Sequence, residues 1–113
     1  MKLPQADRAE IPHEKLYGYL LSRAHPVGRF KAAFFAKLGS RSDTWQGFAA
    51  DLRTQHLTQD AQLVETTEFG QKYEIRAILK GPIGPPVMVV SIWLIPSDGG
   101  SPRFVTAYPG GRS

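Results

Sequence analysis

The stretch KYEIRAILKGPIGPPVMVVSIWLI, residues 72–95, decides the fold class. Apolar and charged residues alternate along Lys72–Lys80, which is the two-residue period of a strand with one buried face. The glycines and prolines of Gly81–Pro86 indicate a loop. Val87–Ile95 is the most apolar segment, so we expect it to be a central strand.

Two further strands are predicted on either side of this pair. Gln62–Phe69 precedes it, and Gly70 provides a tight turn between the two segments. Ser97–Ser101 is rich in turn residues and leads into a last strand at Arg103–Tyr108. Four consecutive strands joined by short turns predict an antiparallel β-meander.

The first half of the chain has the 3.6-residue period of helices instead. We expect helices over His13–Ser22, from Pro26 or Val27 to Leu38, and from Ser42 or Asp43 to His56. In the second helix the four-residue spacing of Phe30, Phe34 and Leu38 predicts the buried face.

The expected fold class is therefore α+β. About three N-terminal helices pack on a four-stranded antiparallel meander. The 113 residues form one domain, with a helical half at 1–58 and a sheet half at 61–109. One face of the sheet is then covered by helices, and the other is open to solvent or a ligand.

Composition excludes several classes of function. The chain has no cysteine, so disulfides, thiolate zinc sites and cysteine nucleophiles are absent. Its longest apolar run is too short to span a bilayer as a helix, and its N-terminus lacks the apolar core of a signal peptide. We expect a cytoplasmic protein without a membrane partner.

The positive charge is concentrated in one part of the sequence. The formal net charge is +4. Six cations and no acid occur between Lys15 and Arg41, which creates a local field that attracts polyanions. The alternative interpretation is a solvated helix face. The cations are Lys15, Arg23, Arg29, Lys31, Lys37 and Arg41.

The segment HPVGRFK, from His25 to Lys31, has the chemistry of an anion site. It stands where the second helix should begin, and a helix N-terminus presents unpaired N–H groups to negative charge. Arg29 and Lys31 can bind phosphate oxygens, and His25 can move a proton near neutral pH. The alternative is a His-Pro turn followed by an ordinary basic helix.

Hydroxyls and aromatic rings on the strands form the second part of the candidate site. Ser91 and Trp93 on the third strand could share a face with Thr106 and Tyr108 on the fourth, and Tyr73 could join them. Such groups position phosphoesters and stack bases. The alternative is that Trp93 and Tyr73 belong to the core.

Metal or cofactor chemistry is not expected. The three histidines (His13, His25 and His56) are scattered, and no nucleotide-binding or metalloprotease motif is present.

Several segments resemble a family of short bacterial proteins that occur alone and as C-terminal domains of toxin-like polypeptides. They are MKLPQADRA, HPVGRFKAAFF, FGQKYEI, VSIWLI and PRFVTAY. The order of elements is also similar to the ribonuclease-toxin group that includes barnase, EndoU, RelE and the colicin ribonucleases.

This resemblance implies metal-independent cleavage of RNA. It gives His25 the proton transfer and gives Arg29 and Lys31 the phosphate, while Ser91, Thr106 and Tyr108 position the substrate or assist from the sheet. The family pattern His-Pro-x-Gly-Arg-His-Lys has a second histidine where this chain has Phe30. Catalysis would then use His25 alone, or Tyr108 or Tyr73 as the second acid or base, or the activity is lost.

We therefore expect a small ribonuclease toxin that cleaves tRNA or mRNA and is neutralised by a small acidic antitoxin or immunity protein. One alternative is a non-catalytic RNA-binding or adaptor module of a toxin system. Another is a structural domain that forms a homodimer along its last strand.

Overall fold

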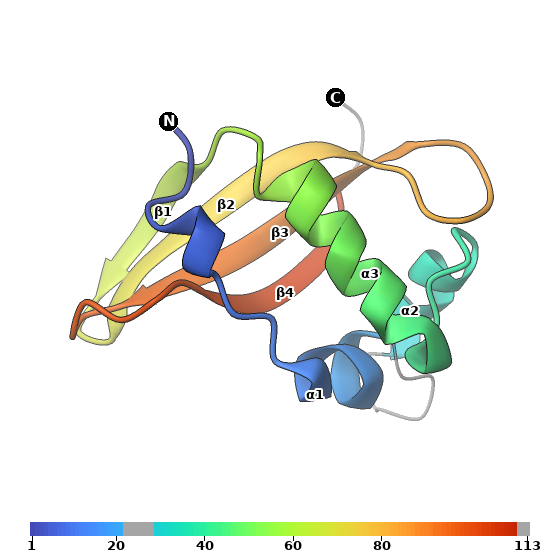
Figure 1. The fold of residues 1–113 in the computed structure, drawn as a ribbon, viewed down its shortest axis with the longest axis horizontal. Helices are drawn as coiled ribbons and strands as arrows, with labels where there is room; N and C mark the ends of the chain where they lie inside the picture. The colour runs from blue at the N-terminus through green and yellow to red at the C-terminus, as the bar shows by residue number, and fades with distance from the viewer. Residues whose placement is uncertain (22–28, 111–113) are drawn as a thin grey trace.

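A computed structural model describes residues 1–21 and 29–110 of the chain (Figure 1). Its sheet consists of β1 (Gln62–Thr67), β2 (Gly70–Leu79), β3 (Val87–Pro96) and β4 (Arg103–Pro109). The strands pair in the order β1-β2-β3-β4, and all three pairs are antiparallel. The prediction of an α+β fold with a four-stranded antiparallel sheet is confirmed.

The predicted helices are matched only in part. α1 (His13–Lys15) is a single turn that continues as the π-helical turn η2 (Leu16–Leu20), and α2 covers Arg29–Ala36. The third helical segment begins with the 3-10 turn η3 (Ser42–Thr44), continues as α3 (Trp45–Asp51) and ends in the π-helical turn η4 (Leu52–His56). A further 3-10 turn, η1 (Ala6–Arg8), lies in the N-terminal segment.

The π-helical turns have a direct packing consequence. The amide of Leu21 donates to the carbonyl of Leu16 at 2.8 Å, and the amide of Leu57 donates to that of Leu52 at 2.9 Å. A hydrogen bond between residues five apart closes a wider turn than the bond between residues four apart in an α-helix. Each bonded pair consequently lies on one side of its helix, and all four leucines are buried.

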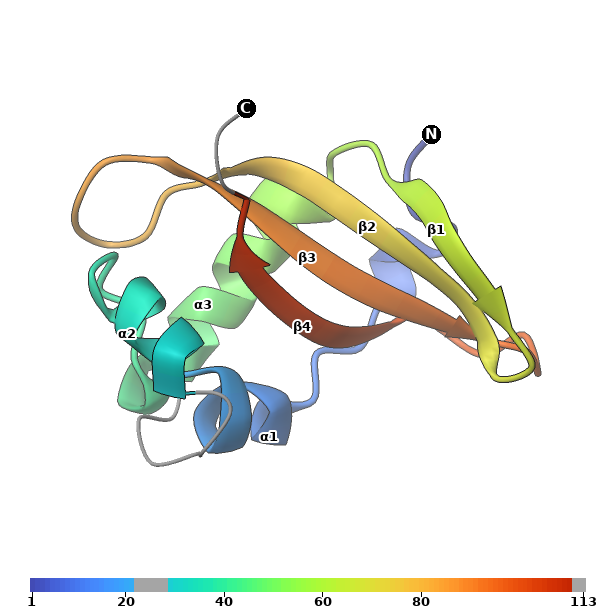
Figure 2. The same ribbon diagram turned by 180° about the vertical axis from the view of Figure 1, so that it is seen from behind.

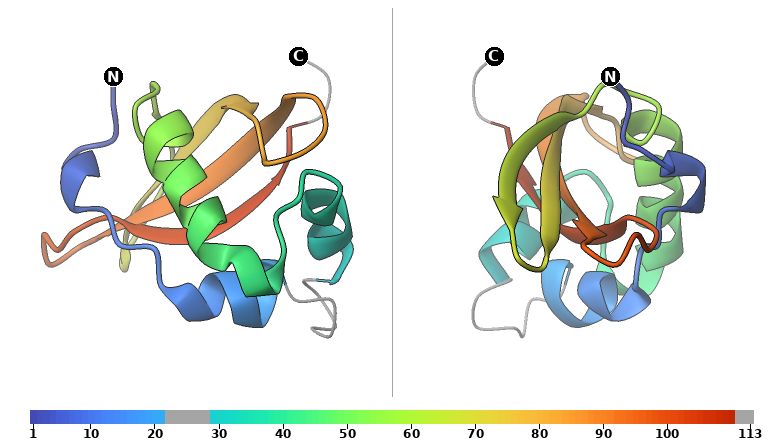
Figure 3. Two further views of the ribbon diagram at one scale, coloured as in Figure 1. Left: turned by 45° about the vertical axis from the view of Figure 1, so that its right-hand side comes forward. Right: turned by 90° about the vertical axis from the view of Figure 1, so that its left-hand side faces the viewer.

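The core lies between the sheet and the segment α3–η4. Phe48, Leu52 and His56 follow one another at four-residue spacing and are all buried against the sheet. Figure 1 shows α3 crossing in front of the strands, and the end-on view in Figure 3 places it on one side of the sheet. On the opposite face, no helix of the described residues lies over β1–β3, and α2 lies at the β4 edge (Figure 2).

The buried face of α2 differs from the prediction. Phe35 is fully buried and Leu38 nearly so, whereas Phe34 is only partly buried and packs against the core. The buried positions are thus set by the three-residue spacing of Ala32, Phe35 and Leu38. α2 packs beside β4, at one edge of the sheet (Figure 2).

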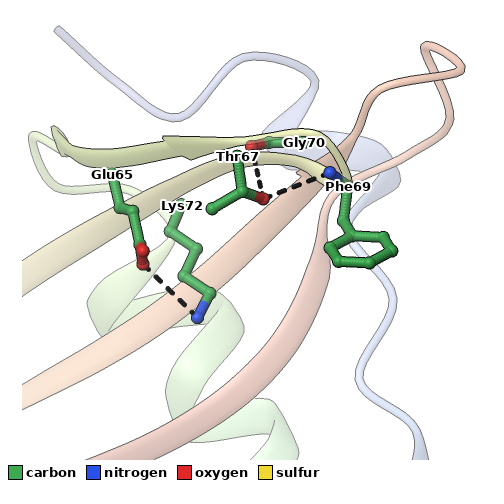
Figure 4. Close-up of polar contacts among 5 residues, drawn as sticks. All are labelled: Glu65, Thr67, Phe69, Gly70 and Lys72. Atoms are coloured by element: carbon green, nitrogen blue, oxygen red, sulfur yellow. Dashed lines mark hydrogen bonds and ion pairs between the residues drawn. The ribbon is translucent and has the colours of Figure 1, made fainter.

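The turn between β1 and β2 lies at the end of the sheet shown in Figure 4. Thr67 Oγ1 accepts a bond from the amide of Phe69 at 3.2 Å. Gly70 has φ +146°, and a Cβ there would collide with the carbonyl oxygen of Ile95. The predicted tight turn therefore requires glycine. An exposed ion pair of 3.5 Å joins Lys72 to Glu65 across the two strands.

Candidate phosphate-binding site

Three polar side chains form a hydrogen-bonded chain inside the core. Trp93 Nε1 donates to Ser91 Oγ at 2.9 Å, and Ser91 Oγ lies 2.7 Å from Nδ1 of His56. His56 Nε2 lies 3.2 Å from the carbonyl oxygen of Ala77. Because a carbonyl only accepts, Nε2 carries the proton and the Ser91 hydroxyl donates to Nδ1. With this protonation, the neutral imidazole makes a hydrogen bond with both Ser91 and Ala77.

This buried cluster, His56–Ser91–Trp93, cannot reach a ligand. All three residues are 0% exposed. A serine hydroxyl bonded to an imidazole is the geometry of an activated nucleophile, but here it has no access to substrate. Burial lowers the pKa of His56 to about 4, because a charged imidazolium would lose its hydration, and the bond to Ala77 only partly opposes this. The cluster is structural.

The sequence prediction for Ser91, Trp93 and Tyr73 is corrected by these positions. Tyr73 is also buried, at 7% exposure, so none of the three forms an open platform for substrate. The register gives the reason: Ser91 is opposite Ala107, and Ile92 is opposite Thr106. Residues directly opposite each other share a face, so Thr106 and Tyr108 point away from Ser91 and Trp93.

A β-bulge determines which side chains of β4 share the uncovered face. Trp93 pairs with Phe104 and Ile92 with Thr106, which leaves Val105 as the extra residue. The bulge reverses the alternation along β4. As a result Arg103, Thr106 and Tyr108 lie on the face opposite to Phe104 and Ala107, which are buried in the core.

Lys31 connects this side of β4 to two helical segments. Its Nζ, on α2, lies 3.1 Å from the hydroxyl of Tyr19 on η2 and 3.1 Å from Oγ1 of Thr106. The ammonium group also lies 5.5 Å from the centre of the Tyr19 ring. All three side chains are half-buried. We call Tyr19, Lys31 and Thr106 the edge cluster.

The edge cluster alters the acidity of Tyr19. The hydrogen bond from Lys31 lowers the pKa of the phenol, and the Thr106 bond and the charges of Lys31 and Lys15 act in the same direction against the opposing effect of burial. A cation beside a phenol favours the phenolate. The cluster thus combines a fixed positive charge, a hydroxyl and a phenol that gives up its proton more readily than usual.

The predicted site residues are brought together only in part. Lys31 and Thr106 are in direct contact, as expected for one site. Tyr108 lies on the same face of β4, two residues beyond Thr106, and is half-buried. His25 and the side chain of Arg29 lie outside the described residues.

Sequence reasoning missed Tyr19 and the place of His56. Tyr19 is a tyrosine outside the apolar stripe of its helix, beside a basic segment, and that combination was a usable signal. His56 continues the four-residue spacing of Phe48 and Leu52, so its burial could be read from the helix period.

Two features were sought in the described part of the chain, a cluster of metal ligands and a membrane-spanning helix. Within residues 1–21 and 29–110, no three His, Asp or Glu side chains gather as metal ligands would. The helices over the same residues are too short or too polar to cross a bilayer.

Comparison with known protein families gives one match. The sequence profile described as "Domain of unknown function (DUF6883)" matches residues 2–111. The chain belongs to this family. The DUF6883 match covers both the helical segments and the sheet, so the edge cluster and the buried cluster lie inside the family domain. No curated protein and no solved structure matches the chain.

Proposed function

We propose that this chain binds RNA through the edge cluster and cleaves it without a metal ion, as a small ribonuclease toxin acting on tRNA or mRNA in the cytoplasm. The observation that carries the proposal is the position of Lys31 Nζ, 3.1 Å from both the Tyr19 and Thr106 hydroxyls. A cation held between two hydroxyls offers charge and hydrogen bonds to a phosphodiester at one point.

The edge cluster supplies the groups that such cleavage requires. The phenolate of Tyr19 takes the proton of a ribose 2′-hydroxyl, and the 2′-oxygen attacks phosphorus. Lys31 and the Thr106 hydroxyl stabilise the negative charge that builds on the phosphate oxygens. The bond to the 5′-oxygen breaks as that oxygen takes up a proton, leaving a 2′,3′-cyclic phosphate.

The second proton transfer is assigned to His25 or Tyr108. Tyr108 belongs to the same strand face as Thr106. His25 lies outside the described residues, and the sequence places it six residues before Lys31. Phe30 stands where the pattern His-Pro-x-Gly-Arg-His-Lys of the resembled toxin-like proteins has a second histidine, so Tyr19 takes the role of base in this proposal.

The direct test is an RNA cleavage assay in the presence of EDTA. The purified chain is incubated with total tRNA beside Lys31→Ala and a matched control, Lys2→Ala. Lys2 pairs with Asp60 just before β1, at the opposite edge of the sheet from β4. We expect cleavage to persist with EDTA, to fall about 100- to 1000-fold in Lys31→Ala and to remain unchanged in Lys2→Ala.

Two results would contradict this function. Cleavage abolished by EDTA would show that a metal is needed. RNA binding with a strong salt dependence but no cleavage by the unmodified chain would identify a non-catalytic RNA-binding module instead.

The proposed partner is a small acidic antitoxin or immunity protein that covers the edge cluster with carboxylates. Complementary charge across such an interface accelerates association. The start of the β4 edge is already occupied, since the amide of Phe104 donates to the carbonyl of Glu10 at 2.8 Å. A partner that protects the edge cluster should therefore inhibit cleavage by the chain and lose affinity for Lys31→Ala.

A further inference from the structure

We propose that the cleft between α1 and β4 is a second phosphate subsite, which makes the substrate a single-stranded RNA of several nucleotides rather than a mononucleotide or dinucleotide. The inference rests on the proposed function, because it extends the edge cluster along the same strand. It assigns new binding roles to Lys15 and Arg103.

The cleft is a cavity of about 240 Å³ with a mixed lining. Its cationic side chains, Lys15 and Arg103, are exposed. Its remaining walls are Pro12, Leu94, Phe104 and Val105. Two exposed cations beside the half-buried Pro12, Leu94 and Val105 match a nucleotide, because the phosphate can meet the charges and the base or sugar can contact the apolar side chains.

The bulge at Val105 places this cleft in line with the edge cluster. Arg103 is opposite Leu94 and Thr106 is opposite Ile92, and these two partners lie on the same face of β3. Leu94 and Ile92 are two residues apart on β3, which spans about 7 Å at ~3.3 Å per residue. A single strand that leaves Thr106 therefore reaches Arg103 within a few nucleotides.

Lys15, on α1, also links the cleft to the edge cluster. It lies four residues before Tyr19, and its charge is one of the causes of the lowered pKa of the Tyr19 phenol. The field of the cleft thus extends to the edge cluster. Lys31, Lys15 and Arg103 form a cationic path that runs from α2 past η2 and α1 to the start of β4.

The acids near this path do not neutralise it. Glu14 Oε1 lies 3.3 Å from Nε2 of His13. The backbone of Glu10 binds β4, since its carbonyl accepts the amide of Phe104. Within residues 1–21 and 29–110, no carboxylate lies within ion-pair distance of Lys15 or Arg103.

A length series of RNA probes tests the subsite. The probes are 2′-O-methyl oligonucleotides of two, four and six nucleotides, which lack the nucleophilic hydroxyl and stay intact. Binding is measured by fluorescence anisotropy at several salt concentrations for the unmodified chain, Lys15→Ala, Arg103→Ala, Lys31→Ala and the control Lys2→Ala. Circular dichroism checks that each variant is folded.

We expect affinity to rise with length and the subsite variants to be selective. Lys15→Ala and Arg103→Ala should each lose about fivefold in affinity for the hexanucleotide, with a salt slope smaller by about 0.7, and should bind the dinucleotide normally. Lys31→Ala should weaken binding at every length. Lys2→Ala should match the unmodified chain.

The outcomes separate the two proposals. If the unmodified chain binds the hexanucleotide but Lys15→Ala and Arg103→Ala bind it equally well, the second subsite is wrong and the edge cluster stands. If the unmodified chain binds no probe at any length, both proposals fail. Equal affinity for a double-stranded probe would overturn the single-stranded assignment.

Discussion

Ser91 and Thr106 are hydroxyl residues on neighbouring strands, and each is bonded to a nitrogen of a helical segment. Ser91 Oγ lies 2.7 Å from His56 Nδ1, and Thr106 Oγ1 lies 3.1 Å from Lys31 Nζ. Thr106 is opposite Ile92, the residue after Ser91, so the two hydroxyls are one strand position apart but on opposite faces. Ser91 is 0% exposed, whereas Thr106 is half-buried.

The difference shows that burial determines whether a polar group stabilises the fold or is accessible to a ligand. In the buried cluster the nitrogen belongs to a neutral imidazole, because a charge would be unsolvated there. At the sheet edge the nitrogen belongs to Lys31, whose hydrogen bond and charge lower the pKa of the neighbouring Tyr19 phenol. The buried cluster should therefore control unfolding, and the edge cluster should control RNA binding and cleavage.

The largest expected effect is on the core beside α2. Phe35→Ala should lower the free energy of unfolding by about 3–5 kcal/mol, because Phe35 is fully buried and its ring packs edge-on against Phe34 and Phe48 at 5.0 Å. Urea denaturation measures this change.

Phe34→Ala is the matched control for this prediction. Phe34 carries the same side chain one residue earlier but is only partly buried. Its substitution should cost clearly less. An equal or greater loss in Phe34→Ala would show that the buried face of α2 is the one expected from the sequence.

The next effect is a loss of stability in acid caused by His56. The folded pKa of about 4 lies below the ordinary value of 6.5, so the folded state resists protonation while the unfolded state accepts it. This contribution is fully present above pH 6.5 and is lost as the pH falls to about 4, a decrease of roughly 3 kcal/mol. Urea unfolding at several pH values, compared with His56→Gln, isolates it. A His56→Gln variant with the same acid dependence as the unmodified chain would refute the assignment.

A smaller effect compares the two hydroxyls directly. Ser91→Ala leaves Trp93 Nε1 and His56 Nδ1 without their partner inside the core and should cost about 1–3 kcal/mol. Thr106→Val keeps the shape of a half-exposed side chain and should cost about 0.5 kcal/mol or less. Thermal or chemical unfolding of both variants measures the two losses of stability. A greater loss in Thr106→Val than in Ser91→Ala would contradict the assignment of Ser91 to the core and Thr106 to the surface.

Much of the fold could be predicted because period and turn chemistry act locally. The alternation in Lys72–Lys80 and the apolar run in Val87–Ile95 correspond to β2 and β3, and Gly70 stands at the predicted turn. Lys31 and Thr106 could be selected as candidate site residues because a cation and a hydroxyl can both bind phosphate oxygens.

The remaining features depend on tertiary structure. The bulge at Val105 reverses the face of Arg103 relative to Thr106, and regular alternation cannot foresee it. The burial of Ser91 and Trp93 follows from which sheet face α3 covers, which the sequence left open. The largest cause of the lowered pKa of Tyr19 is the hydrogen bond to its hydroxyl from Lys31, which α2 brings from another part of the chain.

The most direct test of the central claim is the single-turnover cleavage rate of Tyr19→Phe measured beside its unfolding free energy. Removing this hydroxyl leaves the ring in place but takes away the proposed base and the Lys31 bond. We expect a rate about 100-fold lower, with stability within about 1 kcal/mol of the unmodified chain. An unchanged rate in a folded Tyr19→Phe variant would contradict it.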